Sequence, residues 1–340
     1  MVAASIRMNV GYLIEDGYQH AFPVRALLRV RKAPVFTTGA QIAARFRDQT
    51  DVIVAPFPKL VELMKARAID VVFTTSQNFD PDAIRKTIPT ARVVHIGHGE
   101  SDKTHGPSNE RRFVYDQNNR RFDLMLIASH EHDRLSVNPN RELVGYLRHD
   151  LVVANGLHER IPDPWILWAP AYGQHSAIEP WLDAVVDATA RLERRLVIHL
   201  HPFSARLEPH VVRRVQAVVL ASPHVRLARV LDLAELMARC ELMLGDVSSA
   251  SWDWLMFDRP IVFLDHPGLD KPEEKRVFSV GPVVSPGDDV TAVLAAELAA
   301  PTTRSSDRTT ALADRYFSLD GHAARRAIEA TERWWSERWQ

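Results

Sequence analysis

Short runs of apolar and β-branched residues recur along the first half of the chain and alternate with stretches of helical periodicity. The apolar runs predict strands at Ile6–Ile14, Asp51–Ala55, Ile69–Thr75, Arg92–Ile96 and Phe122–Ala128. A helix is predicted over Phe57–Arg67, between the second and third of these strands. Several of the strands are apolar at almost every position, which is typical of strands covered on both faces.

The second half repeats this alternation. Strands are predicted at Trp165–Ala169, Arg195–Leu200, Val225–Ala228, Leu242–Leu244 and Ile261–Leu264. The helices between and around them are predicted at Ile178–Arg194, Pro209–Ala221, Asp232–Cys240 and Ser251–Phe257. The pattern predicts an α/β protein with two doubly wound, parallel sheets, and a ligand cleft between two domains at the strand ends.

The polar, proline-containing stretch Asn155–Pro164 is the predicted linker. It separates an N-terminal α/β domain over 1–158 from a second α/β domain over 159–320. The segment Pro301–Arg308 is predicted to be a surface loop. A final helix over about His322–Trp339, within 321–340, is rich in Trp and Arg and is expected to pack back on the first domain.

Length, charge and cysteine content exclude some classes of function. The chain has 340 residues, of which 46% are hydrophobic, enough to build two cores. The formal net charge is -1, so nucleic acid is not an expected partner. The single cysteine, Cys240, lies in an apolar helical pattern and is expected in a hydrophobic core. One cysteine cannot form an intrachain disulfide, which fits a cytoplasmic protein.

The sequence was also searched for a secretory signal and for a membrane-spanning segment. The first residues show no secretory signal, and no apolar run reaches about 18 residues. Any membrane association is therefore expected to be peripheral, on the inner face of the cell membrane. A basic N-terminal cluster could touch anionic lipid there, formed by Arg25, Arg29, Arg31 and Lys32.

Three polar segments follow predicted strands, where binding residues gather in α/β proteins. The first runs from His95 to Lys103 and contains His98 between Gly97 and Gly99. A histidine there could act as a general base, glycine allows close backbone approach, and Lys103 could meet an anion. An ordinary loop with a solvated histidine is an equally good reading of the composition.

The second segment carries His199 and His201 at the end of a strand. Residues two apart in a strand face the same side, so the two imidazoles are expected to project together and to bind a metal or a phosphate. A buried core histidine is the usual alternative for each of them.

The third segment, Leu244–Asp253, reads as a strand, a glycine turn and the start of a helix. Ser248 or Ser249 is a plausible N-cap, and helix N-termini with serine hydroxyls bind phosphate. A simple N-cap without ligand is the alternative. No Walker motif or GxGxxG occurs. Two further groupings are weaker. The run His130-Glu131-His132 is typical of a solvated face, and the basic cluster Arg111, Arg112, Arg120 and Arg121 could contact a phosphorylated acceptor or simply lie on the surface.

In order and spacing, the three segments resemble the CDP-glycerol:poly(glycerophosphate) glycerophosphotransferase family of teichoic acid synthesis. The resemblance covers roughly residues 90–330 and rests on His98-Gly99 with Lys103, on His201-Pro202, on Asp246, Ser248, Ser249 and Asp253, and on Arg259–Phe263, Gly281–Val284, Tyr316-Phe317 and Asp320-Gly321.

The resemblance implies a GT-B fold and transfer of a polyol phosphate from CDP-glycerol or a related CDP-polyol to a hydroxyl, releasing CMP. The acceptor would be a teichoic acid, capsule or other cell-surface polymer, or its lipid-linked precursor. No cofactor and no metal are expected. His98 would be the general base and His201 would bind the phosphoryl oxygens. Substrate-binding roles would fall to Gly99, Lys103, Asp246, Ser248, Ser249 and Asp253.

Three alternatives stay open on the sequence alone. The nearest is a GT-B glycosyltransferase that uses a sugar nucleotide. A metal-dependent hydrolase built on His199 and His201 would need further ligands and a single barrel. A non-catalytic nucleotide-binding protein would bind CDP without turnover.

Overall fold

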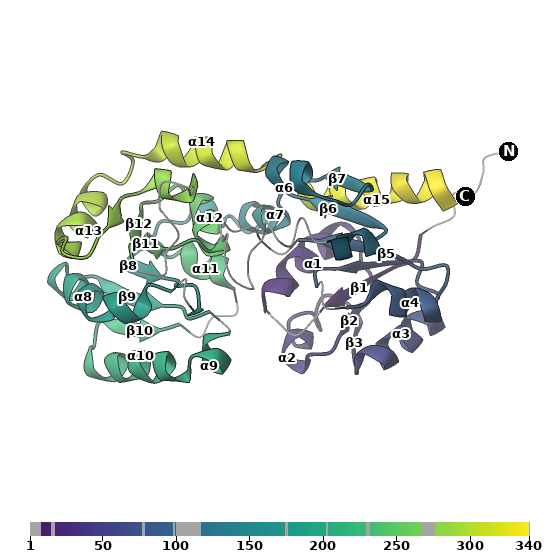
Figure 1. The fold of residues 1–340 in the computed structure, drawn as a ribbon, viewed down its shortest axis with the longest axis horizontal. Coiled ribbons are helices and arrows are strands. Elements are labelled where there is room, and N and C mark those ends of the chain that lie inside the picture. Colours follow the sequence, from purple (N-terminus) through teal and green to yellow (C-terminus); the bar gives the residue numbers. More distant parts are fainter. Residues whose placement is uncertain are drawn as a thin grey trace. The chain divides into compact units, whose positions relative to one another are not determined.

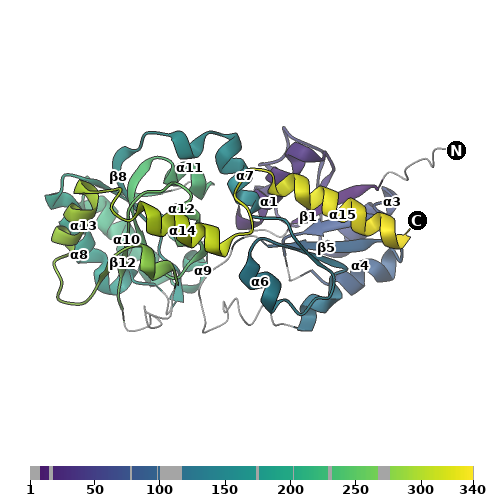
Figure 2. The same ribbon diagram turned by 90° about the horizontal axis from the view of Figure 1, so that it is seen from above.

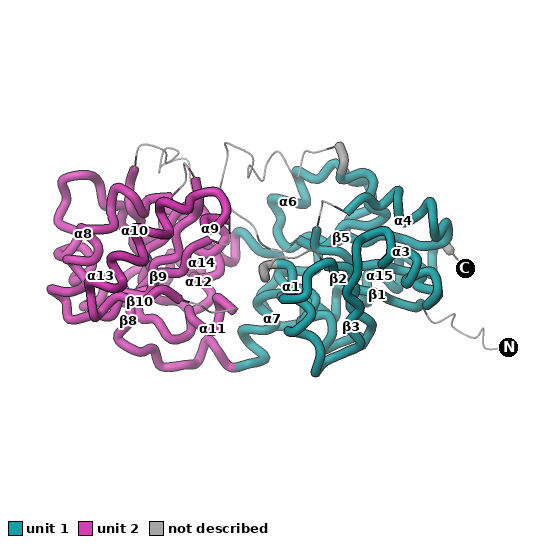
Figure 3. The backbone as a smooth tube through the Cα atoms, turned by 90° about the horizontal axis from the view of Figure 1, so that it is seen from below, with its two compact units in different colours: residues 1–99, 111–155, 315–340 teal, residues 100–110, 156–314 magenta. Residues whose placement is uncertain are grey.

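The structure, a computed structural model, describes residues 8–14, 18–76, 79–97, 99, 117–173, 176–201, 203–228, 232–266 and 276–339. It divides the chain into two compact units, which Figure 3 colours separately. Unit 1 holds the described parts of 1–99 and 111–155 together with 315–339, and unit 2 holds 156–314. The chain therefore passes from one unit to the other at Asn155/Gly156 and returns at Asp314/Arg315.

Unit 1 is built on a parallel sheet in the order β3-β2-β1-β4-β5-β6-β7. Its strands are β1 (Val10–Ile14), β2 (Val35–Thr37), β3 (Val52–Val54), β4 (Val71–Thr74), β5 (Arg92–Ile96), β6 (Leu124–Ile127) and β7 (Arg141–Leu143). The hydrophobic pattern predicts β1, β3, β4, β5 and β6; β2 and β7 have only three residues each, too few for periodicity to mark.

Helices cover both faces of this sheet (Figure 1). Tyr12 and Ile14 of β1 face a core shared with α1 (Tyr18–Val30), α7 (Leu147–Ala154) and α15 (Ala323–Trp339). Leu13, which points to the other face, joins a core with α3 (Phe57–Ala66) and α4 (Pro81–Thr87). Among the described residues of the unit, the other helical segments are α2 (Ala40–Ala43), a 3-10 turn at Gln117–Arg121, and α6 (His130–Leu135).

Unit 2 is built on a second parallel sheet in the order β10-β9-β8-β11-β12-β13. Its strands are β8 (Asp163–Trp168), β9 (Arg195–Ile198), β10 (Val225–Leu227), β11 (Cys240–Gly245), β12 (Ile261–Leu264) and β13 (Val283–Val284). One face packs against α8 (Ile178–Arg191), α10 (Pro209–Ala221) and α13 (Val290–Ala299). Strand residues that point to the other face, such as Leu167, Val197 and Met243, are buried as well.

Both sheets reverse their direction of winding once. In unit 1 the chain builds outward from β1 to β3 and then restarts at β4 beside β1; in unit 2 it builds from β8 to β10 and restarts at β11 beside β8. Each unit is thus doubly wound, as the sequence predicts, with a topological switch point where ligands bind in open α/β sheets. These are two open sheets, so the single barrel that the hydrolase alternative needs is contradicted.

The C-terminal helix α15 belongs to unit 1 and lies along α1 and α7 (Figures 1 and 2). Its first N–H groups, at Ala323 and Ala324, donate to the buried carboxylate of Asp150 at 3.1 and 2.7 Å. Asp150 stands in α7, so this carboxylate supplies the acceptors that a helix N-terminus lacks. Upstream, the ring of Tyr316 stacks on Tyr146 with centroids 4.7 Å apart.

Two local predictions are wrong. The segment Pro301–Arg308 is not simply a surface loop, because α14 (Ser305–Arg315) begins inside it and Arg308 is fully buried. The guanidinium of Arg308 donates to the carboxylate of Asp258 at 2.8 Å, which offsets its burial. Cys240 is buried as predicted, but it opens strand β11 rather than closing a helix, since α11 covers only Leu233–Met237.

Candidate active site

The switch point of unit 2 lies between the loops that follow β8 and β11. Asp246, directly after β11, is buried and accepts two backbone N–H groups: Oδ2 accepts that of Ala171, in the loop after β8, and Oδ1 accepts that of Ser248 at 2.9 Å. The hydroxyl of Ser251 donates to the Asp246 carbonyl oxygen at 2.6 Å. Asp246 therefore joins the two central loops of the sheet and fixes the backbone of Ser248.

Ser248 stands at the N-cap position of α12 (Ser249–Leu255), with an extended backbone (φ -83°, ψ 163°). Its side chain makes no capping hydrogen bond. The residue is 7% exposed, and its hydroxyl oxygen is buried without a hydrogen-bond partner among the residues that the structure describes. A buried polar group without a hydrogen bond costs free energy and needs an explanation. A bound ligand would be one explanation. The simple N-cap alternative therefore does not account for this hydroxyl.

Ser249 and Asp253 share the same helix. Ser249 is its half-buried first residue, at the end where backbone N–H groups lack intrahelical acceptors. Asp253 is 2% exposed within the helix. The structure thus places Asp246, Ser248, Ser249 and Asp253 on one short segment at the carboxyl edge of the sheet.

His201 lies in the loop after β9, the neighbour of β8. Its Nδ1 accepts the backbone N–H of Phe203 at 3.1 Å. A nitrogen that accepts a hydrogen bond carries no proton, so in the neutral imidazole the proton sits on Nε2. His201 is half-buried and packs on Tyr172, with ring centroids 4.5 Å apart.

The expected pairing of His199 with His201 rests on a strand that is longer than the observed one. Strand β9 ends at Ile198, so the alternation of a strand does not apply to these residues. His199 is buried and its pKa is lowered to about 4 by burial, so its ring is held neutral. Among the described residues, no group of three or more His, Cys, Asp or Glu side chains could hold a metal ion.

The first predicted segment follows β5, at the carboxyl edge of the other sheet. Gly97 and Gly99 are described, and Gly97 is exposed. His98 and Lys103 lie outside the described residues, so their predicted roles stay predictions. The same holds for Arg111 and Arg112 of the basic cluster.

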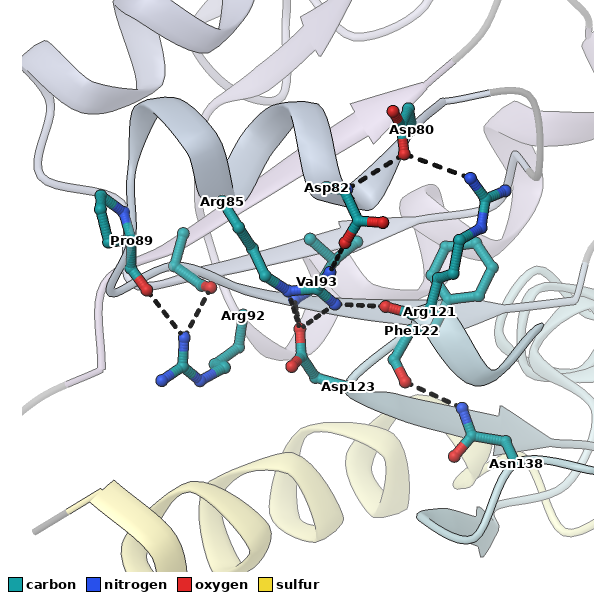
Figure 4. Close-up of polar contacts among 11 residues, drawn as sticks. Asp80, Asp82, Arg85, Pro89, Arg92, Val93, Arg121, Phe122, Asp123 and Asn138 are labelled. Atoms are coloured by element: carbon teal, nitrogen blue, oxygen red, sulfur yellow. Dashed lines mark hydrogen bonds and ion pairs between the residues drawn. The ribbon is translucent and has the colours of Figure 1, made fainter. Parts of the chain in front are cut away.

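The other arginines of that cluster have local partners, and Figure 4 shows those of Arg121. Arg121 forms an ion pair with Asp80 at 3.2 Å. Its carbonyl oxygen accepts from Arg85, which also pairs with the Asp123 carboxylate at 2.9 Å. Arg120 donates to the carbonyl oxygen of Val137 at 3.2 Å. These contacts explain Arg120 and Arg121 as parts of the fold of unit 1.

A polar cluster in unit 1 has no counterpart among the sequence predictions. His20, near the start of α1, places Nδ1 3.1 Å from both the carbonyl and the hydroxyl oxygen of Thr75, in the segment after β4. The contact therefore bridges the switch point of this sheet, between β1 and β4. Burial lowers the pKa of His20 to about 4. A lone histidine at this position gives no sequence signal for such a contact.

The Arg259-Pro260 pair before β12, part of the family resemblance, also has a structural reason. The buried guanidinium of Arg259 donates to the carbonyl oxygens of Met237, Ala238 and Cys240 and to that of Arg160. It satisfies carbonyl groups left free where α11 ends and β11 begins. Arg259 therefore stabilises the strand that carries Asp246.

The sequence matches the family model described as CDP-glycerol:poly(glycerophosphate) glycerophosphotransferase over residues 34–332. This span takes in most of both units, including all three polar segments, and leaves out β1, α1 and the C-terminal turns of α15. The chain belongs to this glycerophosphotransferase family. It is therefore an enzyme of the CDP-glycerol glycerophosphotransferase type, as the three polar segments predict.

Solved structures resemble the whole chain at low sequence identity. The wall teichoic acid polymerase TagF, in a structure soaked with CDPG, is 14% identical with a TM-score of 0.63, over 98% of this chain and 89% of that one. A putative UDP-N-acetylglucosamine 2-epimerase from Listeria monocytogenes is 16% identical with a TM-score of 0.64, over 97% and 98%.

The UDP-GlcNAc 2-epimerase from Methanocaldococcus jannaschii, in complex with UDP-GlcNAc and UDP, is 11% identical with a TM-score of 0.63, over 95% and 99%. These likenesses confirm the predicted GT-B class of fold. The comparison with curated proteins finds no match. In the part of the chain that is described, no helix has the length and apolar character to cross a membrane.

Proposed function

We propose that this glycerophosphotransferase moves glycerol phosphate, or a similar polyol phosphate, from a CDP-activated donor to a hydroxyl of a cell-surface polymer or its lipid-linked precursor, releasing CMP. The observation that carries the proposal is the Ser248 hydroxyl, buried without a described partner at the switch point of unit 2. Its backbone is already fixed by Asp246, so the hydroxyl is set in place before a ligand arrives.

The donor pyrophosphate would bind at the start of α12. Ser248 and Ser249 each offer a hydroxyl, and the first N–H groups of the helix point the same way along its axis. Phosphoryl oxygens are strong acceptors, and donors preset around them need no reorganisation during the reaction. Asp253 would orient a hydroxyl of the donor. Unit 2 would therefore be the donor side and unit 1 the acceptor side.

His201 would donate from Nε2 to a phosphoryl oxygen of the donor. The Phe203 N–H fixes the tautomer with the proton on Nε2, which suits a hydrogen-bond donor and not a base. As charge moves onto the departing CMP, such a donor stabilises the transition state more than the ground state.

Proton removal would be the task of His98. The acceptor hydroxyl attacks the β-phosphorus, and the new O–P bond forms as the bond from the β-phosphorus to the bridging oxygen breaks. The electron pair leaves with CMP, and the hydroxyl proton passes to His98; a positioned base of this kind contributes about 10²–10⁴-fold. Gly99 would allow close approach of the backbone to the substrate, and Lys103 would neutralise a phosphate.

We propose that the reaction takes place in the cytoplasm, at the inner face of the cell membrane, with which the single cysteine of the chain is compatible. Teichoic acid or capsule assembly would be the context. The contact with the membrane would be peripheral.

Calorimetric titration without added metal tests the donor. The panel contains CDP-glycerol, CDP-ribitol, CDP and several UDP-sugars. Selective binding of a CDP-polyol is the expected result. Selective binding of a UDP-sugar would instead favour a sugar-nucleotide enzyme, the class to which the 2-epimerase neighbours belong by name. Binding of CDP together with an absence of CMP release from CDP-glycerol would favour a non-catalytic protein.

A further inference from the structure

The imidazole of His201 lies in an aromatic cluster made by two loops of unit 2. Tyr172 comes from the loop after β8, and its ring lies 4.5 Å from that of His201, centroid to centroid. Phe203 comes from the loop after β9 and meets Tyr172 edge to face at 5.3 Å and His201 at 5.3 Å. Contacts from two separate loops restrict the imidazole more than either loop alone could.

A carboxylate joins the same two loops. Oε1 of Glu208 accepts the N–H of Gly173 at 2.9 Å, and Oε2 accepts the hydroxyl of Ser204 at 3.0 Å. Gly173 follows Tyr172 directly and has a left-handed backbone (φ +66°), which glycine adopts without strain. Ser204 opens α9 (Ser204–Leu207), three residues after His201. Glu208 thereby fixes the backbone beside Tyr172 relative to the segment that carries His201.

The backbone of Phe203 adds a third restraint. Its N–H donates to Nδ1 of His201, so rotation of the imidazole would break this bond as well as the contact with Tyr172. A catalytic hydrogen bond depends on such support, because a misplacement of about 1 Å can cost about 100-fold in rate.

We infer that Tyr172 and Glu208 are positioning residues for His201: Glu208 fixes the loop that carries Tyr172, and the ring of Tyr172 holds the imidazole in the orientation in which Nδ1 accepts the Phe203 N–H and the proton stays on Nε2. Neither residue acts on the substrate itself. The inference rests on the proposed function only for what His201 does with that proton; the geometry and the tautomer are properties of the free protein.

The test uses the full-length protein labelled with ¹⁵N-histidine and a pH at which imidazole is neutral. Long-range ¹H–¹⁵N spectra distinguish the protonated from the unprotonated ring nitrogen, and the spectrum of His201→Gln assigns the signals. In the wild type we expect a protonated Nε2 and an unprotonated Nδ1 for His201. Tyr172→Phe keeps the ring and should keep this pattern.

Tyr172→Ala and Glu208→Ala should move the two ¹⁵N shifts toward each other, as both tautomers become populated. Glu208→Gln keeps an oxygen for the Gly173 N–H and should restore most of the difference. Glu235→Gln, an exposed glutamate of α11, is the matched control and should change nothing. An unprotonated Nε2 in the wild type, or wild-type shifts in both alanine variants, would overturn the inference.

Turnover separates this inference from the proposed function. For CMP release from CDP-glycerol, Tyr172→Ala and Glu208→Ala should lower kcat about 10-fold to 100-fold while KM for the donor stays within about twofold. If the wild type does not turn over CDP-glycerol but shows the predicted tautomer shifts, the proposed function fails and the positioning of His201 stands. If turnover is normal in both alanine variants, the positioning role is overturned and the proposed function stands.

Discussion

The backbone N–H of Ser248 donates to Oδ1 of Asp246 at 2.9 Å, while the hydroxyl of the same serine is buried with no partner among the described residues. The main chain of Ser248 is thus held in place, and its hydroxyl is the group that the proposed function assigns to the donor phosphates. The carboxylate that fixes it also accepts the N–H of Ala171, across the switch point of the sheet. Asp246 is therefore a structural anchor of the candidate site, and its substrate-binding role stays a prediction.

Two serines of this segment should respond to alanine in opposite ways. Ser248→Ala removes a buried hydroxyl that lacks a partner, so the Tm of the ligand-free protein should stay the same or rise. Ser251→Ala removes a hydroxyl that donates to the Asp246 carbonyl oxygen at 2.6 Å, and should cost about 1–3 kcal/mol. Thermal and denaturant unfolding of the two variants provide the comparison. A clear loss of stability in Ser248→Ala would mean that its hydroxyl has a protein partner.

Asp246→Asn should destabilise unit 2. The amide nitrogen of asparagine would face either the Ala171 N–H or the Ser248 N–H, donor against donor, at a cost of about 1–3 kcal/mol. The denaturant midpoint measures this loss. Asp183→Asn is the matched control: its carboxylate is exposed and pairs with Arg214 at the surface, where an ion pair contributes about 0–1 kcal/mol. Equal effects of the two substitutions would contradict the anchoring role.

Arg259→Lys should also destabilise the protein, although it keeps the charge. A lysine ammonium cannot reproduce the planar guanidinium that donates to the carbonyl groups before and at the start of β11. With buried acceptors left unsatisfied, a loss of about 2–4 kcal/mol is expected in chemical denaturation. Arg226→Lys, at an exposed arginine whose bonds among the described residues go to the nearby carbonyl groups of Pro223 and Val225, should change stability little. A wild-type midpoint for Arg259→Lys would remove this explanation of the Arg-Pro pair.

Stability should fall as the pH is lowered from about 6.5 to about 4. Burial lowers the pKa of His20 and of His199 from 6.5 to about 4, so in this window the unfolded chain binds more protons than the folded protein. Each histidine accounts for on the order of 3 kcal/mol across the window. Asp150 acts in the opposite direction, because burial raises its pKa and its protonation favours the folded state.

The dependence can be assigned with variants. His199→Gln should flatten the curve of Tm against pH between these limits, and His20→Gln should do the same from the other unit. His210→Gln, at an exposed histidine of α10, should leave the slope unchanged. Parallel curves for all three variants and the wild type would show that buried histidines do not set the acid limit.

Helices and strands are predicted best from the sequence where their buried positions repeat with the period of the helix or strand itself. Helix α10 at Pro209–Ala221 and strand β12 at Ile261–Leu264 coincide with their predictions. Helix α1 is not predicted, because Pro23 lies inside it and removes a backbone donor that a helix normally needs. Packing of its apolar face on α7 and α15 outweighs that loss, and α15 is some 300 residues away in sequence, which no local pattern reveals.

The environment of polar residues likewise depends on contacts with residues far away in sequence. Arg308 reads as part of a solvated loop, yet it is fully buried because Asp258, fifty residues earlier, accepts its hydrogen bonds. At the candidate site, the pattern of Leu244–Asp253 correctly predicts that Asp246 and Ser248 lie just after a strand, which is β11. Their hydrogen bonding to Ala171 and the support of His201 by Glu208 depend on which strands are neighbours, which only the folded sheet determines.

The affinity of the free enzyme for CDP-glycerol, compared between the wild type, Ser248→Ala and the exposed control Ser306→Ala, tests the central claim most directly. Loss of a hydrogen bond to a charged phosphate should raise Kd about 10-fold to 100-fold in Ser248→Ala and leave Ser306→Ala at the wild-type value. Wild-type affinity in Ser248→Ala would contradict the assignment of the donor phosphates to the start of α12.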